Sequence, residues 1–279
     1  MAEMDSLPPP NPMSSTPQPA PKQFNVWQQN LNKSQVAQED LINSGIHKDY
    51  DILALQEPYI DAFGNTKATR NWRVLYMTSH LSDPMLPRAV MLVSSDLNTN
   101  EWAQIQIPNT WDLLAIQLTG DFSLLTVFNV YNDCHNSDAI DRLRMHLHSQ
   151  AQGPGHGIAG ATYSMWCSDF NRHHPMWDEE RNHHLFTAQA LEELLKLITL
   201  AADHDMYMAL PKDIPTLESM STKNWTRPDN VFCSTGLADS VICCMTSPGL
   251  RGPGTDHVPI LTALEFLVER VSNEMGHNF

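Results

Sequence analysis

Short apolar runs, each about as long as a single β-strand, recur through most of the chain and restrict it to a fold rich in β-sheet. In LLAIQL (113–118), Leu114, Ile116 and Leu118 alternate with small or polar residues, and this period of two is typical of a strand whose two faces differ. The sequence therefore predicts many short strands. They are predicted at residues 24–27, 51–56, 72–77, 88–94, 113–118, 122–131, 162–168, 230–234, 239–245 and 258–264.

Predicted helices are fewer and lie between distant groups of strands. Residues 34–44 can begin at Ser34 as the N-cap and end at Gly45. Two further amphipathic stretches are predicted to be helical, residues 137–149 and 183–200. Because helices do not alternate with single strands, we expect an α+β fold. The expected architecture is a four-layer αββα sandwich, in which two packed mixed or antiparallel β-sheets are flanked by helices.

The chain is predicted to contain one folded domain. Residues 1–23 are rich in proline and serine and predict a disordered tail, residues 24–270 form the domain, and 271–279 form a short C-terminal tail. No apolar stretch approaches the roughly 18 residues of a membrane-spanning helix, and the N-terminus lacks a signal-peptide pattern. The five cysteines contain no CxxC pair, which argues against a disulfide framework or a structural zinc site. A soluble intracellular protein is therefore expected, without membrane partners.

The charge balance is acidic. The formal net charge is −15, from 17 Lys and Arg against 32 Asp and Glu. Such a balance works against non-specific binding to nucleic acid, which depends on neutralising phosphates. A bound divalent cation would reverse the field locally, although this accounts for only a few of the charges.

Polar side chains stand at the ends of several predicted strands. If these strands lie side by side, their ends converge on one cleft. Carboxylates and amides are hard oxygen ligands that suit Mg²⁺ or Mn²⁺, a histidine beside an acid can stabilise phosphate oxygens, and a further carboxylate can align a water. This combination indicates metal-assisted hydrolysis of a phosphate ester. The residues at these strand ends are Asn30, Glu57, Tyr131, Asn132, Asp169, Asn171, Asp229, Asp256 and His257.

These residues, in this order, resemble the endonuclease/exonuclease/phosphatase superfamily, which has the deoxyribonuclease-I-like fold. Within it, the chain looks most like the apurinic-type endonuclease domain of non-LTR (LINE-type) retrotransposons. The resemblance spans about residues 24–266, and the ordered succession of SDFNRHHPMWD, PDNVF and TDH is its most specific part. The matching motifs are NLN (30–32), LQEP (55–58), NVYN (129–132), SDFNRHHPMWD (168–178), PTLES (215–219), RPDNVF (227–232) and TDHVPI (255–260).

The resemblance implies a metal site that holds Mg²⁺, with Mn²⁺ as the alternative. Glu57 would be the principal ligand, and Asn30 would complete the shell directly or through water. Asp256 would assist the metal or the water.

The resemblance also implies the catalytic residues. Asp169 would position or activate the attacking water, and Asn171 would hold the water or the phosphate oxygens. His257 would stabilise the transition state while Asp229 fixes its ring by a hydrogen bond. Tyr131 would contact the scissile phosphate, although the residues alone are equally consistent with a tyrosine at the edge of the core.

Substrate-binding residues are implied less specifically. Thr216 falls where the family has a threonine that forms hydrogen bonds in the site, and Arg227 is a candidate for a phosphate contact. His173 and His174 would lie in a structured loop and touch nucleic acid or pack. A histidine metal site formed by these two and the later pair at 183–184 is the less favoured interpretation, because that later pair is expected to open the helix at 183–200.

The implied function is a metal-dependent DNA endonuclease of retrotransposon origin that nicks its target and leaves a 3′-hydroxyl. It would act on DNA, in the nucleus if the DNA is genomic, with a reverse transcriptase as a separate partner. Two alternatives remain open. One is a phosphatase or phosphodiesterase of the same fold acting on a small phosphorylated substrate, which the acidic charge favours. The other is a catalytically impaired binding remnant, which Ser168 suggests because the family usually has glycine there.

Overall fold

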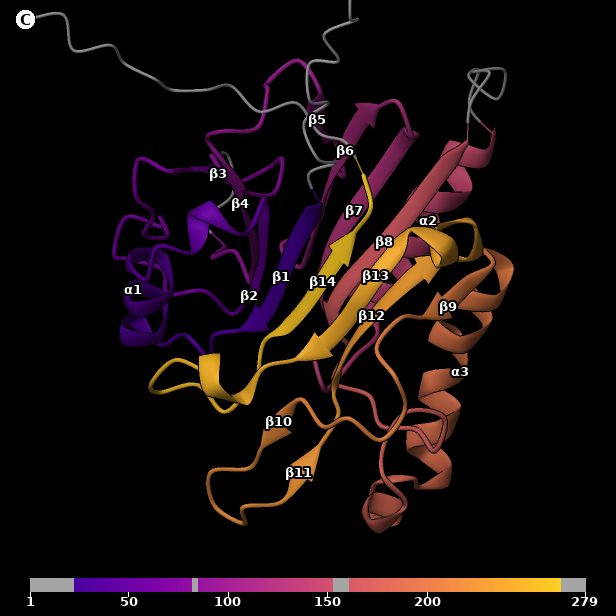
Figure 1. The fold of residues 1–279 in the computed structure, drawn as a ribbon. Coiled ribbons are helices and arrows are strands. Elements are labelled where there is room, and N and C mark those ends of the chain that lie inside the picture. Colours follow the sequence, from indigo (N-terminus) through magenta and orange to yellow (C-terminus); the bar gives the residue numbers. More distant parts are fainter. Residues whose placement is uncertain (1–22, 82–84, 153–160, 267–279) are drawn as a thin grey trace, which may run out of the picture.

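Two six-stranded β-sheets lie face to face, with helices on their outer surfaces, in the computed structural model of the chain (Figure 1). The structure describes residues 23–81, 85–152 and 161–266. Both sheets combine parallel and antiparallel strand pairs, so the predicted αββα sandwich of mixed sheets is confirmed. Apart from residue 23, the predicted tails at 1–23 and 271–279 lie outside the described residues.

The first sheet brings together strands from both ends of the described chain. Its strands β1 and β2 are parallel, whereas β14 runs antiparallel to β1 and β4 runs antiparallel to β2. In spatial order it contains β13 (Val241–Thr246), β14 (Ile260–Leu264), β1 (Phe24–Asn30), β2 (Ile52–Gln56), β4 (Ala89–Ser94) and β3 (Trp72–Leu75).

The second sheet is built from the middle of the chain. Its strands β7 and β8 are parallel, and β12 runs antiparallel to β8. In spatial order it contains β5 (Trp102–Ile105), β6 (Leu113–Gly120), β7 (Ser123–Tyr131), β8 (Thr162–Asp169), β12 (Asp229–Ser234) and β9 (Met206–Met208). A separate two-stranded ribbon, β10 (Leu217–Glu218) with β11 (Trp225–Thr226), projects beyond the sheets (Figure 1).

Three apolar layers hold these elements together, because each sheet buries both of its faces. The central layer lies between the sheets and includes Val26, Ile116 and Met165. Helix α1 covers the outer face of the first sheet, and α2 with α3 cover the outer face of the second. Trp27 and Trp72 belong to the layer under α1. The α-helices are α1 (Gln35–Asn43), α2 (Asp138–Gln152) and α3 (Ala188–Asp203), and the 3₁₀ helices are η1 (Ile46–Lys48), η2 (Glu180–Leu185), η3 (Thr235–Ser240) and η4 (Pro248–Leu250).

The predicted helix at 183–200 is wrong at its start. Residues 180–185 form the 3₁₀ helix η2, and α3 begins only after Thr187, whose side chain accepts a hydrogen bond from the Ala190 N–H. His183 and His184 therefore lie in η2 and do not open α3. Among the described residues, no helix is both long and apolar enough to cross a membrane.

Strand direction explains why polar residues gather at one edge of the sandwich. β1 and β2 both end there, as do β7 and β8, because each of these pairs is parallel. β12 and β14 begin there, because each runs antiparallel to one of those strands. The convergence of strand ends that the sequence predicts is thus a direct result of sheet topology.

Candidate active site

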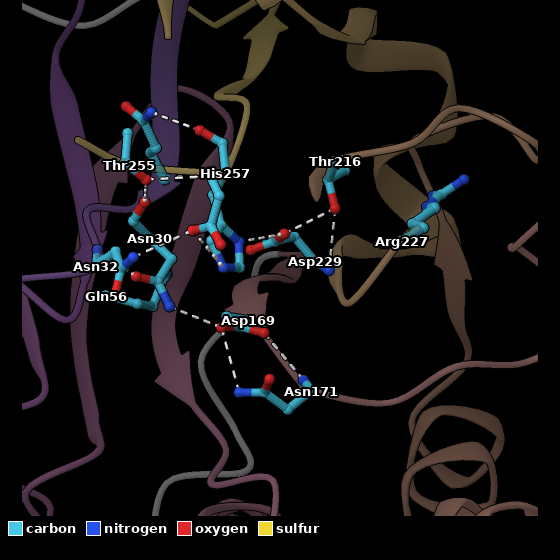
Figure 2. A network of polar contacts seen from close by, with 12 residues as sticks. Asn30, Asn32, Gln56, Asp169, Asn171, Thr216, Arg227, Asp229, Thr255 and His257 are labelled. Carbon is cyan, nitrogen blue, oxygen red and sulfur yellow. Dashed lines mark hydrogen bonds and ion pairs between the residues drawn. The ribbon is translucent and has the colours of Figure 1, made fainter. Parts of the chain in front are cut away.

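The register of the second sheet places three of the predicted residues side by side. Tyr131, the last residue of β7, pairs with Asp169, the last residue of β8, and Asp169 pairs in turn with Asp229, the first residue of β12. Asp169 and Asp229 are each only 1 % exposed. Figure 2 shows their carboxyl groups facing Asn30, the last residue of β1, and His257, which lies in the segment before β14.

Asp169 is held by amides from both sheets. The Asn30 side chain donates to its Oδ2 at 2.8 Å, and the Asn171 side chain donates to the same oxygen at 3.2 Å. The Asn171 backbone N–H donates to Oδ1 at 3.0 Å, and Asn171 itself has a left-handed backbone, with φ of 50°. The side chain of Asn171 also donates to the Asn132 carbonyl. The local turn therefore fixes the orientation of the carboxyl group.

A second buried group consists of His257, Asp229 and Thr216. The Nδ1 atom of His257 lies 2.8 Å from Asp229 Oδ2, and the Thr216 hydroxyl donates to the same oxygen at 2.7 Å. The remaining carboxyl oxygen accepts from the Gln28 amide at 3.3 Å. Asp229 thus directs Nδ1 of the ring inward and leaves Nε2 on the side of Asp256, whose carboxylate lies 3.9 Å away.

Electrostatics set the protonation of this cluster. Burial alone would lower the pKa of His257, but Asp229, with help from Asp169 and Asp256, overcomes it and raises that pKa to about 9. Burial, followed by repulsion from Asp229, raises the pKa of Asp169 to about 7. At neutral pH the imidazole is therefore a cation, and Asp169 stands close to its point of ionisation.

The two buried carboxyl groups of this cluster could share a divalent cation, whereas a protonated His257 has no free ring nitrogen to offer as a ligand. Ligand atoms of Asp169, Asp229 and His257 all lie within 4.8 Å of one another. Burial, followed by repulsion from Asp229, raises the pKa of Asp169, so a hard cation beside the two carboxyl groups would favour its ionised form.

Glu57 lies at the solvent side of this cluster. It follows β2 directly and has a left-handed backbone, with φ of 41°. Its carboxylate accepts from the Asn30 amide at 3.4 Å and lies 3.1 Å from the Lys33 ammonium group. Lys33 is a contact that the sequence analysis did not include. The position of Glu57 beside Asn30 agrees with the predicted ligand pair, and its role as a ligand stays a prediction.

Asp256 and Thr255 connect the last strand to the first. The Asp256 carboxylate lies 3.9 Å from His257 Nε2 and accepts from the Asn32 amide at 3.4 Å. The Thr255 hydroxyl donates to the Asn30 carbonyl at 2.8 Å and accepts from the His257 N–H at 3.2 Å. Thr255 therefore fixes His257 relative to Asn30, a role that the motif TDH alone did not reveal.

Tyr131 borders the cluster at the end of β7 and is 9 % exposed. Burial, together with the nearby carboxylates of Glu57 and Asp169, raises the pKa of its hydroxyl, which therefore stays protonated. The guanidinium group of Arg88 lies over the ring, 5.0 Å from its centre.

The prediction of Arg227 as a substrate-binding residue is wrong. Its side chain is 0 % exposed and donates to the carbonyls of Leu210 and Pro211 and to the side chain of Asn230. Figure 2 shows it pointing away from the cluster. These bonds hold the segment after β9 against β12, so Arg227 has a structural role.

His173 and His174 lie in an ordered loop beside the site. His173 Nδ1 is 2.8 Å from the carboxylate of Asp178, which also accepts from the Asn182 amide. His174 accepts from the Met176 N–H and packs against the ring of Trp177. The structure thus places both in a packed loop, and a contact with substrate stays a prediction.

Ser168 has the regular extended backbone of β8 and is not among the residues with positive φ. The concern that this position needs glycine for its backbone is therefore not supported. The side chain is 0 % exposed, and its hydroxyl has no hydrogen-bond partner in the structure.

A buried amide network beneath the site was also missed by the sequence analysis. The Gln28 side chain donates to Gln56, and the Gln56 side chain donates to Asn129 at 2.6 Å. Asn129 comes from the second sheet and donates to the Leu55 and Val90 carbonyls of the first sheet. Only the pairing of the two sheets brings these amides together, so no local pattern could have indicated them.

Comparisons with known proteins agree with this fold. Residues 125–261 match the family model described as Endonuclease-reverse transcriptase. Among solved structures, the endonuclease domain of TRAS1, a telomere-specific non-LTR retrotransposon, is 18 % identical, with 86 % of this chain and 98 % of that chain covered and a TM-score of 0.64. No curated protein matches the chain.

Two other similar structures come from different organisms. The AP endonuclease LMAP from Leishmania major is 14 % identical, with 87 % of each chain covered and a TM-score of 0.68. The catalytic domain of APE2 from Xenopus laevis is 14 % identical, with 89 % of this chain and 94 % of that chain covered and a TM-score of 0.63.

Two packed mixed sheets between outer helices form the αββα sandwich that is also found in the AP endonuclease structure. Residues 125–261 carry the pattern of an endonuclease/exonuclease/phosphatase family model, and the fold of the chain is similar to that of a non-LTR retrotransposon endonuclease domain.

Proposed function

We propose that the protein is a metal-dependent DNA endonuclease, related to those of retrotransposons, that hydrolyses a phosphodiester and leaves a 3′-hydroxyl. The observation that carries this proposal is the buried cluster at the sheet edge. In it, a carboxyl group near its point of ionisation and a carboxylate-oriented imidazolium lie within 4.8 Å of each other.

The side chains divide the work of such a reaction. Asp169, held by Asn30 and Asn171, would accept a proton from the attacking water, since its pKa of about 7 suits a base near neutral pH. His257 would donate from Nε2 to an oxygen of the phosphate and stabilise the charge that develops there. Asn171 would help to orient the water or the phosphate.

Glu57 and Asn30 would hold Mg²⁺ or Mn²⁺, with Asp256 assisting from the other side of His257. A bound cation of this kind stabilises the charge on a phosphate oxygen as the ester is cleaved. The Glu57 side chain is 16 % exposed, and the Lys33 ammonium group lies 3.1 Å from its carboxylate.

The test is a plasmid-nicking assay. Supercoiled DNA is incubated with the protein and Mg²⁺, beside an EDTA control and the His257→Ala variant. We expect open circles from the wild type, loss of nicking in EDTA, and a rate reduced at least about 100-fold in the variant. Equal nicking by wild type and variant would show that the observed cleavage comes from another source.

One observation favours a second candidate, a phosphatase or phosphodiesterase of the same fold acting on a small molecule. The formal net charge of −15 repels a nucleic-acid polyanion more strongly than it repels a small ester. Release of phosphate from a panel of small phosphorylated compounds, together with no nicking of plasmid, would favour this alternative.

A further inference from the structure

Arg88 occupies the junction between the two sheets, directly before β4. Its carbonyl oxygen accepts from the Glu57 N–H at 2.8 Å, and its own N–H donates to the Trp111 carbonyl at 3.0 Å. The backbone of Arg88 thus contacts both the predicted metal ligand and the segment that leads into β6. Any shift of this residue would move Glu57 relative to the second sheet.

The side chain of Arg88 is held by two carboxylates that flank strands of the second sheet, Asp112 before β6 and Asp133 after β7. Nε and Nη2 donate to the two oxygens of Asp112 at 2.6 and 2.7 Å, and Nη1 donates to Asp133 at 2.5 Å. A bidentate pair of this kind fixes the plane of the guanidinium group. The hydrogen bonds to Asp112 raise the pKa of Arg88, so it is a permanent cation.

The same arrangement fixes Tyr131 in two ways. The guanidinium group lies over the phenol ring, 5.0 Å from its centre. The Tyr131 N–H donates to the Asp112 carbonyl at 2.8 Å, so the residue that orients Arg88 also anchors the tyrosine backbone. A planar cation on the ring face restricts the directions in which the hydroxyl can point.

The charges exclude a simple phosphate-binding role for Arg88. Its positive charge is outnumbered by the two carboxylates that it contacts, and its side chain is only 34 % exposed. A phosphate would have to displace Asp112 or Asp133 to be bound. The side chain of Arg88 is therefore better placed to orient Tyr131 than to bind a ligand.

We propose that Arg88 is a positioning residue that holds the Tyr131 hydroxyl toward the substrate phosphate and keeps it in register with Glu57. This inference rests on the proposed function. Arg88 acts through Tyr131 and does not itself touch the substrate. Lysine at this position keeps the charge but loses the bidentate pairing and the planar contact with the ring.

The first test is a double-mutant cycle for DNA nicking with Arg88→Lys and Tyr131→Phe. We expect Arg88→Lys to lower kcat about tenfold while KM stays within about twofold, because a misplaced group costs rate more than binding. In the Tyr131→Phe background, Arg88→Lys should change kcat by less than about twofold. An equal loss in both backgrounds would overturn the proposal, since Arg88 would then act independently of Tyr131.

The second test does not depend on activity. The protein is labelled with 3-fluorotyrosine, and the resonance of position 131 among the six tyrosines is identified by its absence in Tyr131→Phe. Arg88→Lys and Asp112→Asn should both shift this resonance. The matched control is Arg73→Lys, because Arg73 is part-buried and donates to the Ser94 and Leu97 carbonyls at the far end of the first sheet.

An unchanged resonance in folded Arg88→Lys and Asp112→Asn would overturn the proposal, and so would a shift of equal size in Arg73→Lys. If the wild type cuts no DNA, the proposed function fails, but the fluorine spectra still decide whether Arg88 holds Tyr131. Thermal melting of each variant establishes that it is folded.

Discussion

At the scale of single residues, the decisive feature is the balance of charge around His257. Two buried carboxyl groups and one imidazole share a space in which little water can screen them. The carboxylate of Asp229 pairs with the imidazolium, which balances one negative charge. A negative charge on the other carboxyl group, Asp169, would be left without a counter-charge. This explains why the two groups with the strongest proposed roles in proton transfer also have pKa values displaced toward neutral and alkaline pH.

The first prediction concerns stability and pH without metal. The pKa of His257 is raised from 6.5 to about 9. Its contribution to the free energy of unfolding is therefore complete below pH 6.5 and is lost as pH rises through about 9. The pKa of Asp169 is raised from 3.8 to about 7, so the fold loses stability as pH rises across that interval. Urea unfolding should show both losses.

Two reference variants distinguish the contribution of Asp169 to stability from that of His257. The stability difference between wild type and Asp169→Asn should fall from pH 4 to 7, and that between wild type and His257→Asn should fall from 6.5 to 9. Differences that rise with pH in these windows would contradict the assigned charge states.

The second prediction concerns Ser168, whose buried hydroxyl lacks a partner. Ser168→Ala removes this polar group without changing the strand, so the free energy of unfolding should increase by about 1 kcal/mol. Ser168→Gly should be less stable than Ser168→Ala by about 0.5–1 kcal/mol, because glycine gains backbone freedom when unfolded. Urea titrations of the three proteins measure both differences, and an alanine variant less stable than wild type would mean that the hydroxyl is satisfied.

Residue types at strand ends were sufficient to predict most of the cluster. Asp169, Asp229 and His257 are visible in the sequence because polar groups directly border apolar strands there. Arg227 was mistaken for a substrate contact because its true partners include carbonyls 16 and 17 residues earlier in the chain. A side chain's partners across the fold are not encoded in its neighbours, and for a long basic side chain they decide the role.

At the scale of elements, the segment before His257 is fastened to the start of α1. Ser34 caps that helix through the Ala37 N–H and also donates to the Pro253 carbonyl. Gly254 has a φ of 82°, and a Cβ atom there would lie 2.7 Å from the Ser34 hydroxyl. The helix start thus determines where Thr255 and His257 stand relative to Asn30.

The third prediction compares two glycines with the same backbone. Gly254→Ala and Gly45→Ala should each cost about 1 kcal/mol for the left-handed conformation, since both have a φ of 82°. Only Gly254→Ala adds a steric conflict, because nothing lies within 4 Å of a Cβ at Gly45. We therefore expect slower DNA nicking in Gly254→Ala alone. Equal nicking rates in the two folded variants would show that the position of this segment does not affect the site.

Periodicity predicted the long strands and α1 but not the short or interrupted elements. β5, β9, β10 and β11 have four residues or fewer, too few to show a pattern. The stretch from 183 to 200 appeared continuous, but Asn182 bonds to Asp178 and to the Trp225 carbonyl. These contacts hold η2 in place and leave Thr187 to begin a new helix.

At the scale of the whole molecule, the two sheets are joined by amides as well as by apolar packing. Asn129 is 0 % exposed, and its amide reaches the first sheet from the second. Apolar contacts alone tolerate sliding of one sheet over the other, whereas directional hydrogen bonds do not. The network therefore aligns the strand ends that carry the site.

The fourth prediction tests this alignment. Asn129→Leu leaves the Gln56 amide and two carbonyls without this partner, and should lower the free energy of unfolding by roughly 3 kcal/mol. Val127→Ala is the control, because Val127 is equally buried in the layer between the sheets but carries no polar group. Where both variants are folded, nicking should fall more than about tenfold only in Asn129→Leu. A similar loss in Val127→Ala would assign the effect to packing.

The pairing of β1 with β14 brings Phe24 opposite Leu264 and makes the first and last described strands neighbours in one sheet. Contacts between residues so distant along the chain form late in folding, because the entropy of closing the loop must be overcome before the contacts stabilise the fold. During synthesis, Asn30 and Glu57 would leave the ribosome long before the strand that follows His257. The proposed active site would therefore be assembled only after almost the whole domain has been translated, so a chain terminated before Asp256 would hold two of the three proposed metal ligands and lack His257.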